Sequence, residues 1–153
     1  MDTSWIDLDF KLAISHLVTL LTAYVLALPV AWERERSERT AGLRTFPLVA
    51  IAACAYTITG VTVLQSTEAE ARVIQGLITG MGFIGGGAIL KDRGQVTGTA
   101  TAAGLWSTGA VGMAVALHEL EIAIVISVMT FVTLQLMSQV KHIAHLKEPP
   151  KKD

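Results

Sequence analysis

The sequence has few charged residues, a single cysteine and no excess of bases. Charged residues make up 16% of it, whereas a soluble domain usually carries about 25%. The 12 bases against 13 acids exclude a nucleic-acid-binding protein, because neutralising phosphates requires a basic surplus. One cysteine excludes a disulfide framework within the chain and a cysteine-based zinc site. We therefore expect no nucleic-acid partner and no bound metal.

The sparse charges leave long neutral stretches between them. A bilayer core about 30 Å thick takes roughly 20 helical residues at 1.5 Å each. Stretches of about this length predict five transmembrane helices, at 12–32, 46–65, 73–90, 97–117 and 122–140. We expect an all-α, polytopic helical bundle in which residues 1–145 form a single transmembrane domain and residues 146–153 form a short basic cytoplasmic tail.

The bases are unevenly distributed among the predicted loops. Lys and Arg resist crossing the bilayer and therefore collect in cytoplasmic loops. With five spans, the first loop, the third loop and the C-terminal tail share one side and carry 10 bases, whereas the other side carries only Lys11 and Arg72. The asymmetry predicts an outside N-terminus, a cytoplasmic C-terminus and a multi-pass protein of a plasma membrane.

Glycine is concentrated in the centre of the chain, where 11 of the 13 glycines lie between positions 76 and 112. Lipid gives no hydrophobic drive between helices, so close backbone contact through small residues takes its place. Two G-x-x-x-G pairs, Gly76 with Gly80 and Gly82 with Gly86, predict packing grooves on the third span. The fourth span supplies the small partners Gly98, Ala102, Gly109 and Gly112. We expect these two spans to form a tight central hairpin.

Three consecutive glycines at 85–87 leave a second possibility, a third helix that is broken inside the membrane. Each glycine weakens a helix by roughly 1 kcal/mol relative to alanine, and such breaks are typical of ion sites in transporters. Against a transporter, the predicted spans contain no Asp, Glu, Lys or Arg, whereas ion-coupled carriers usually place an ionisable group there.

The glycine run at 80–87 also matches the dinucleotide fingerprint G-x-G-x-x-G. That site needs an acid about 20 residues further on, and residues 98–112 contain none. No predicted span or loop assembles a nucleophile, a base and an orienting group. We therefore expect neither an enzyme nor a cofactor.

Three sequence blocks follow one another in order. The first leads from E-R-E at 33–35 to A-G-L-R-T at 41–45, the second is G-M-G-F-I-G-G-G-A-I-L at 80–90, and the third joins V-T-G at 96–98 to T-A-A-G-L-W at 101–106. Together they resemble the MgtC/SapB family of bacterial inner-membrane proteins. The family-motif and helix-packing residues expected to matter are Glu33, Arg34, Gly42, Arg44, Thr45, Gly80, Gly82, Phe83, Gly85, Gly87, Gly98, Thr101 and Trp106.

The resemblance implies a plasma-membrane protein with about five spans. Characterised relatives are tied to growth in low magnesium and to survival inside macrophages, and one is described as restraining the ATP synthase. Better-known members carry a soluble C-terminal domain, so we expect a short form that lacks it. A histidine often follows the R-T pair in the family, whereas this chain has Phe46.

Two hypotheses about function follow from the residues and the resemblance. The first is a non-enzymatic protein of ion (magnesium) homeostasis, stress adaptation or virulence, which acts by helix contacts with itself or with a membrane partner through residues 76–112. The second is a small homo-oligomeric ion channel or transporter, lined by a glycine break and by the polar stretch 99–108. The expected partners are the lipid bilayer and either a second copy or another membrane protein.

Overall fold

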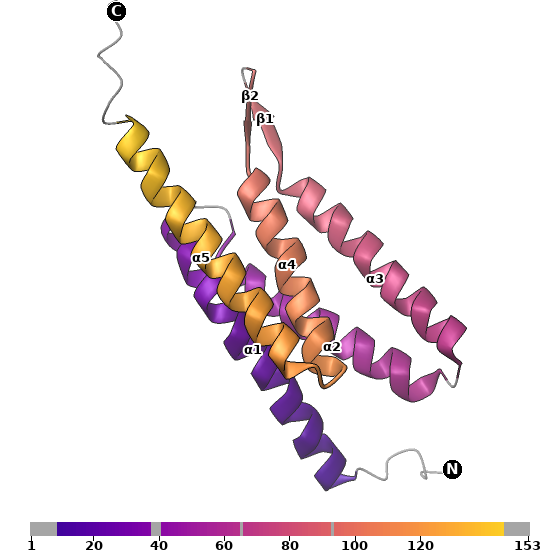
Figure 1. Cartoon of the computed structure of the whole chain (residues 1–153). Coiled ribbons are helices and arrows are strands. Elements are labelled where there is room, and N and C mark those ends of the chain that lie inside the picture. Colours follow the sequence, from indigo (N-terminus) through magenta and orange to yellow (C-terminus); the bar gives the residue numbers. More distant parts are fainter. Residues whose placement is uncertain (1–8, 38–40, 65, 93, 146–153) are drawn as a thin grey trace, which may run out of the picture.

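The computed structural model describes residues 9–37, 41–64, 66–92 and 94–145, which form five helices and one small hairpin (Figure 1). The elements are α1 (Phe10–Ser37), α2 (Thr45–Val63), α3 (Thr67–Gly87), β1 (Leu90–Asp92), β2 (Gln95–Thr97), α4 (Thr99–Ala116) and α5 (Leu120–His145). Each helix overlaps one predicted span, so a helical architecture with five helices is confirmed. The tail predicted at 146–153 lies outside the described residues.

A short β1–β2 hairpin, which the sequence did not predict, adds to the helical architecture. Leu90 pairs with Thr97 and Lys91 pairs with Val96 in an antiparallel ladder. Gly94 lies at the turn with a φ of +84°, a left-handed conformation that glycine adopts without steric cost. The predicted third span at 73–90 therefore ends earlier, at Gly87, and residues 90–92 belong to a strand.

Helix α3 is continuous through the glycine run. It begins at a capped end, where the Ser66 hydroxyl accepts a hydrogen bond from the Ala69 amide at 3.2 Å. Glu68 and Glu70 lie in its first turn, where their negative charges stabilise the helix by interacting with the positive end of its dipole. The helix runs on to Gly87, so the glycines at 85–87 end the helix and do not break it.

Three of the described helices are long and apolar enough to cross a membrane: α1, α2 and the part of α5 at Leu120–Ser138. Helix α3 carries Glu68 and Glu70 in its first turn, and α4 is rich in glycine, alanine and threonine. The count of five spans and the orientation remain predictions.

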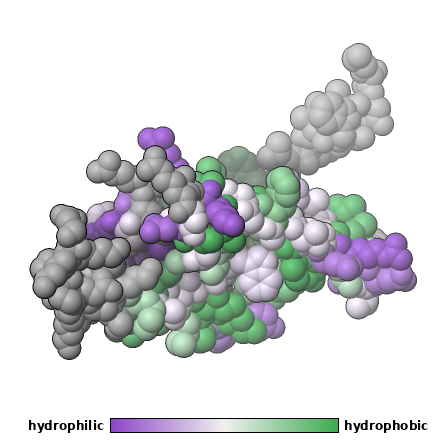
Figure 2. Space-filling model, turned by 90° about the horizontal axis from the view of Figure 1, so that it is seen from above, coloured by the Kyte–Doolittle hydropathy of each residue, from purple (hydrophilic) through white to green (hydrophobic). Residues whose placement is uncertain are grey.

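The core of the bundle consists of small side chains, and large apolar side chains lie outside it. Its main cluster comprises Ala23, Ala27, Ala50, Cys54, Val111, Ala114, Val115 and Ala123. Leu48 and Tyr56, in contrast, are both 64% exposed. Figure 2 shows apolar residues spread over much of the visible surface, with hydrophilic residues in separate patches. Small residues inside and large apolar residues outside are what packing in lipid favours.

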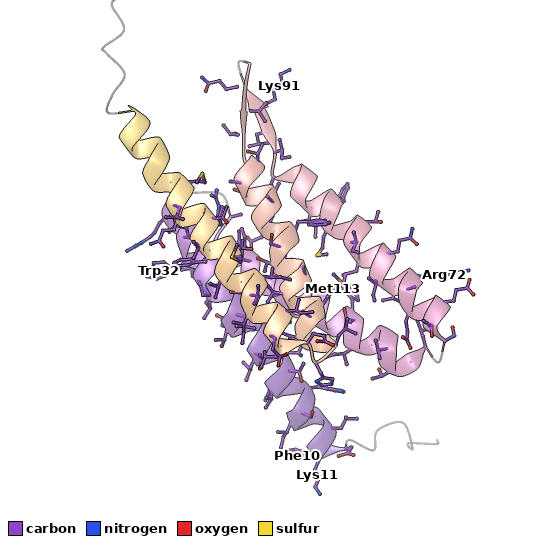
Figure 3. All side chains as sticks on the ribbon, viewed as in Figure 1. Phe10, Lys11, Trp32, Arg72, Lys91 and Met113 are labelled. Carbon is purple, nitrogen blue, oxygen red and sulfur yellow. The ribbon has the colours of Figure 1, made fainter. Side chains whose placement is uncertain are left out.

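Helix α4 lies at the centre of the fold and contacts each of the other four helices. The Ser127 hydroxyl of α5 donates a hydrogen bond to the Leu26 carbonyl of α1 at 2.6 Å, which joins two of the outer helices. Lys91 lies on the hairpin at the top of the view, whereas Lys11 lies at the opposite end of the molecule (Figure 3). The central helix therefore positions the residues of all three sequence blocks.

Candidate functional site

The last turn of α1 carries two charged residues that are buried. Glu33 is 8% exposed and Arg34 is 4% exposed. A buried charge is costly unless hydrogen bonds compensate it, and the Arg34 Nη2 atom donates one to the Thr101 hydroxyl at 2.8 Å. Thr101 is itself 1% exposed and lies in the first turn of α4. This hydrogen bond ties α1 to α4 across 67 residues of sequence.

The opposite face of the same turn is exposed. Trp32 is 52% exposed and points away from the bundle (Figure 3). The Arg36 guanidinium lies 5.3 Å from the centre of its ring, a geometry that attracts a cation to an aromatic face. This turn of α1 thus presents charge to the protein interior on one side and an interfacial aromatic on the other.

The Glu35 side chain links the end of α1 to the residues that precede α2. Its Oε2 atom accepts a hydrogen bond from the Leu43 amide at 2.9 Å. A side chain at Gly42 would collide with the Glu35 carboxylate and with its Cα atom, so glycine is required there. The Gly42 carbonyl in turn accepts bonds from the Thr45 and Phe46 amides at 3.1 Å each. The E-R-E and A-G-L-R-T motifs are therefore one structural unit.

Gly98 connects the hairpin to α4 and is required for two reasons. Its φ is +81°, which side chains rarely tolerate. A Cβ atom there would also collide with the Ala88 carbonyl just after α3. The third sequence block therefore holds the end of α3 against the start of α4, close to the Arg34–Thr101 bond.

The contact between α2 and α4 also depends on glycine. A Cβ atom at Gly104 would lie 3.0 Å from the ring of the buried Phe46, and one at Gly112 would collide with the Ala50 carbonyl. Phe46 is fully buried, so it fills space against the glycine surface of α4. We call the contacts of Gly104 and Gly112 with α2 the α2–α4 seam.

The contact between α3 and α4 uses only part of the glycine-rich segment of α3. Gly85 faces the Ala102 carbonyl, which would lie 3.3 Å from an added Cβ atom. The Met81 side chain fills the space beside Gly109, and Met81 is buried. The two helices therefore pack side by side, as the predicted hairpin requires, through Met81 and Gly85.

The two predicted G-x-x-x-G grooves do not contact α4. Apart from the backbone of α3 itself, no atom of the described residues lies within 4 Å of a Cβ atom built on any of five glycines of this helix, which are Gly76, Gly80, Gly82, Gly86 and Gly87. Phe83, between them, is 85% exposed. The expectation that these pairs seal the hairpin is wrong, because the side of α3 that meets α4 carries Met81 and Gly85. We call these five glycines and Phe83 the open face of α3.

Three further predicted site residues also lie on the outside. Trp106 is 50% exposed on the outside of α4. Arg44 is exposed and Thr45 is half-buried at the start of α2. They line one end of a groove of about 750 Å³ between α2 and α3. The motif residues thus divide into a buried set around Arg34 and an exposed set along α3 and this groove.

Three residues gain a role that the sequence did not show. Phe46 and Ser127 fill or bridge helix contacts, and Glu35 holds the loop at Leu43. The signal for Glu35 was its place in the E-R-E block, and the signal for Ser127 was a small hydroxyl side chain within an apolar stretch. Among the described residues, His, Cys, Asp and Glu do not gather in groups of three or more that could hold a metal ion.

These contacts define a helical membrane protein whose helices pack through small residues around a buried arginine–threonine hydrogen bond. The chain belongs to the MgtC family, whose family model matches residues 20–143. That range contains all three sequence blocks and every residue of the sites described above.

Individual relatives support this membership. The chain is 30% identical to protein SrpB of Synechococcus elongatus, over 94% of this chain and 82% of that protein. It is 32% identical to protein MgtC of Salmonella typhimurium, over 71% of this chain and 46% of that protein. It is 42% identical to an uncharacterized protein of Synechocystis, over 63% of this chain and 41% of that protein. The chain therefore spans less than half the length of the last two relatives. No solved structure matches it.

Proposed function

We propose that this protein is a non-enzymatic, multi-pass protein of the bacterial inner membrane that acts by contacting another membrane protein or a second copy of itself. The open face of α3 is the observation that carries the proposal. Each glycine weakens a helix by roughly 1 kcal/mol relative to alanine, and glycine is useful where a second backbone must approach closely. Among the described residues, no other element lies within 4 Å of a Cβ atom built on any of those five glycines, so a helix outside this chain is the natural partner.

The other helices of the bundle form a scaffold to which α3 is attached. The Arg34–Thr101 bond and the α2–α4 seam hold α1, α2 and α4 together. Helix α3 is attached to them along one side, through Met81, Gly85 and the contact of Val73 with Gly60. Its other side is therefore available for a partner in the plane of the membrane.

The wider role that we propose is in magnesium homeostasis, stress adaptation or virulence. Its support is membership of the MgtC family and the 32% identity to Salmonella MgtC. That identity covers 46% of the Salmonella protein, so the proposed role is one that the aligned membrane part performs.

The buried hydroxyls of α4 disfavour a pore lined by residues 99–108. The Thr101 hydroxyl accepts the Arg34 hydrogen bond, and the Thr108 hydroxyl donates to the Gly104 carbonyl at 2.9 Å. Both threonines are 1% exposed. A channel needs hydroxyls that face water, and these two are used inside the bundle.

Site-specific photo-cross-linking tests the partner contact. A benzophenone amino acid replaces Phe83, and membranes from living cells are irradiated and analysed by mass spectrometry. We expect one dominant protein adduct, either a second copy or one other membrane protein. The double variant Gly82→Leu, Gly86→Leu should abolish this adduct, because leucine side chains block a close approach of backbones.

Ala71→Leu provides the matched control, because it adds similar bulk to an exposed position of the same helix. It should leave the adduct unchanged. An adduct that persists in the double variant, or cross-links to lipid alone, would contradict the proposed contact. Insertion should stay unchanged in all variants, and the thermal midpoint in detergent should not fall, since no neighbouring element lies within 4 Å of a Cβ atom built on either glycine and leucine favours a helix over glycine.

A further inference from the structure

The groove between α2 and α3 is apolar along most of its length. Leu48 and Tyr56 line it from α2, and Leu77 and Ile84 line it from α3. Its volume of about 750 Å³ lies within the roughly 300–1,000 Å³ of small-molecule sites. Gly76 and Gly80, one helical turn apart, also line the groove, and their missing side chains leave it open.

One end of the groove is polar and positively charged. Arg44 and Thr45 line it there, at the start of α2. The guanidinium offers hydrogen bonds in a geometry that suits phosphate. The N-terminus of α2 adds a partial positive charge at the same place. The charge at this end therefore complements an anionic group.

The length of the groove matches one leaflet of a bilayer. Arg44 and Tyr56 line it twelve residues apart, which corresponds to about 18 Å along a helix. Half of a hydrocarbon core is about 15 Å. A chain that starts at Arg44 can therefore reach the middle of the membrane along the groove, whereas a transmembrane helix would extend far beyond it.

We propose that this groove binds one acyl chain of an anionic phospholipid, whose phosphate is held by Arg44 and Thr45. The groove supplies apolar contact for the chain, and the polar end supplies the charge for the headgroup. Arg44 belongs to the base-rich side of the predicted topology, and bases there are attracted to the anionic lipids of the cytoplasmic leaflet. The groove shares Gly76, Gly80 and Phe83 with the open face of α3, whereas Gly82 and Gly86 do not line it, so variants of Gly82 and Gly86 test the partner contact without changing the groove.

Native mass spectrometry of the purified full chain tests the proposal. The protein in detergent is titrated with palmitoyl-oleoyl phosphatidylglycerol, with the phosphatidylcholine of the same chains, or with glycerol 3-phosphate, which lacks chains. We expect phosphatidylglycerol to bind about tenfold more tightly than phosphatidylcholine, as one charge-assisted hydrogen bond predicts. Arg44→Gln should remove this preference. Gly76→Leu should weaken the binding of both lipids, because the leucine side chain fills the groove.

Ala52→Leu narrows the same groove from α2 and serves as a second variant, since Ala52 is an exposed lining residue. Arg72→Gln and Gly82→Leu are matched controls outside the groove and should bind lipid as the natural chain does. These controls separate the two proposals, because failure of the partner contact appears in the cross-linking of the Gly82 and Gly86 variant and leaves lipid binding unchanged.

Three results would overturn the lipid site. The first is equal binding of both lipids by the natural chain. The second is tight binding of glycerol 3-phosphate that Gly76→Leu leaves intact, which assigns the polar end to free phosphate. The third is a lipid-free dimer that Gly76→Leu and Ala52→Leu dissociate, which assigns the groove to a second copy.

Discussion

The α2–α4 seam and the open face of α3 use the same residue type for opposite purposes. At the seam, Gly112 is needed because a carbonyl of the neighbouring helix occupies the place of its side chain. On the open face, no described atom outside the backbone of α3 lies within 4 Å of that place at Gly82. Glycine in the first region is a requirement of the fold, whereas in the second it can be a requirement only of something outside the fold. A glycine-rich segment can therefore hold two functions at once.

The strongest test of this difference introduces a bulky side chain at one glycine in each region. Gly112→Leu should prevent folding or destabilise the protein by about 3 kcal/mol or more, because backbone cannot move aside as a flexible side chain can. Gly82→Leu should keep the natural stability or raise it slightly, because leucine favours a helix over glycine. Size-exclusion profiles and thermal midpoints in detergent measure both. A well-folded Gly112→Leu protein would mean that the seam is not closely packed.

The buried hydrogen bond at the end of α1 is the next test. Thr101→Val removes the acceptor of a charged donor and should cost about 2 kcal/mol of unfolding free energy. The neighbouring Thr99→Val is the matched control, since Thr99 is exposed, and should change little. The double variant Arg34→Met, Thr101→Val should cost less than the sum of the single changes. Additive losses would show that the two residues stabilise the fold separately.

A smaller effect is expected in the loop between α1 and α2. Gly42→Ala displaces the Glu35 carboxylate from the Leu43 amide and should cost about 1.5 kcal/mol, the low end of the range for a hydrogen bond to a charged group. Gly86→Ala, on the open face, should instead stabilise the protein by up to about 1 kcal/mol, because alanine favours a helix. Thermal unfolding in the same detergent compares the two, and equal signs would contradict the division of the glycines.

The smallest expected effect is at Phe83, and the buried Phe46 provides the contrast. Phe83→Ala should change stability by no more than about 0.5 kcal/mol, as exposed positions usually do. Phe46→Ala should cost about 3–5 kcal/mol, because it opens a cavity against Gly104. The contrast is read from thermal midpoints. A large loss in Phe83→Ala would mean that Phe83 packs within the chain and that the open face is not open.

Several features of the fold were predictable because they depend on consecutive residues. The neutral stretches placed all five helices, and the concentration of glycine after Gly76 indicated that α3 and α4 lie together. The hairpin at Leu90–Thr97 was not predicted, because its two strands of three residues are too short to show a period. The end of α3 at Gly87 was not predictable either, because glycines at 85–87 are compatible with a packed, a broken or a terminated helix.

The candidate site was only partly predictable, because contacts between distant residues leave no local pattern. The sequence named Arg34 and Thr101 in separate motifs, but nothing in it showed that they form a hydrogen bond. It also favoured Gly80 and Gly82 as the contact to α4, and that contact is formed by Met81 and Gly85 instead. Residues 80–82 lie within one helical turn, so a rotation of α3 about its axis decides between these alternatives.

The sequence by itself determined that this chain forms apolar helices, because hydrophobic length and charge are properties of consecutive residues. It also contained the motifs of the MgtC family, which the family comparison confirms. Only the tertiary structure decided which glycines meet a neighbouring helix and which remain open, and that Arg44 stands at the end of an apolar groove. The physical reason is that the rotation and tilt of each helix result from packing against all its neighbours at once.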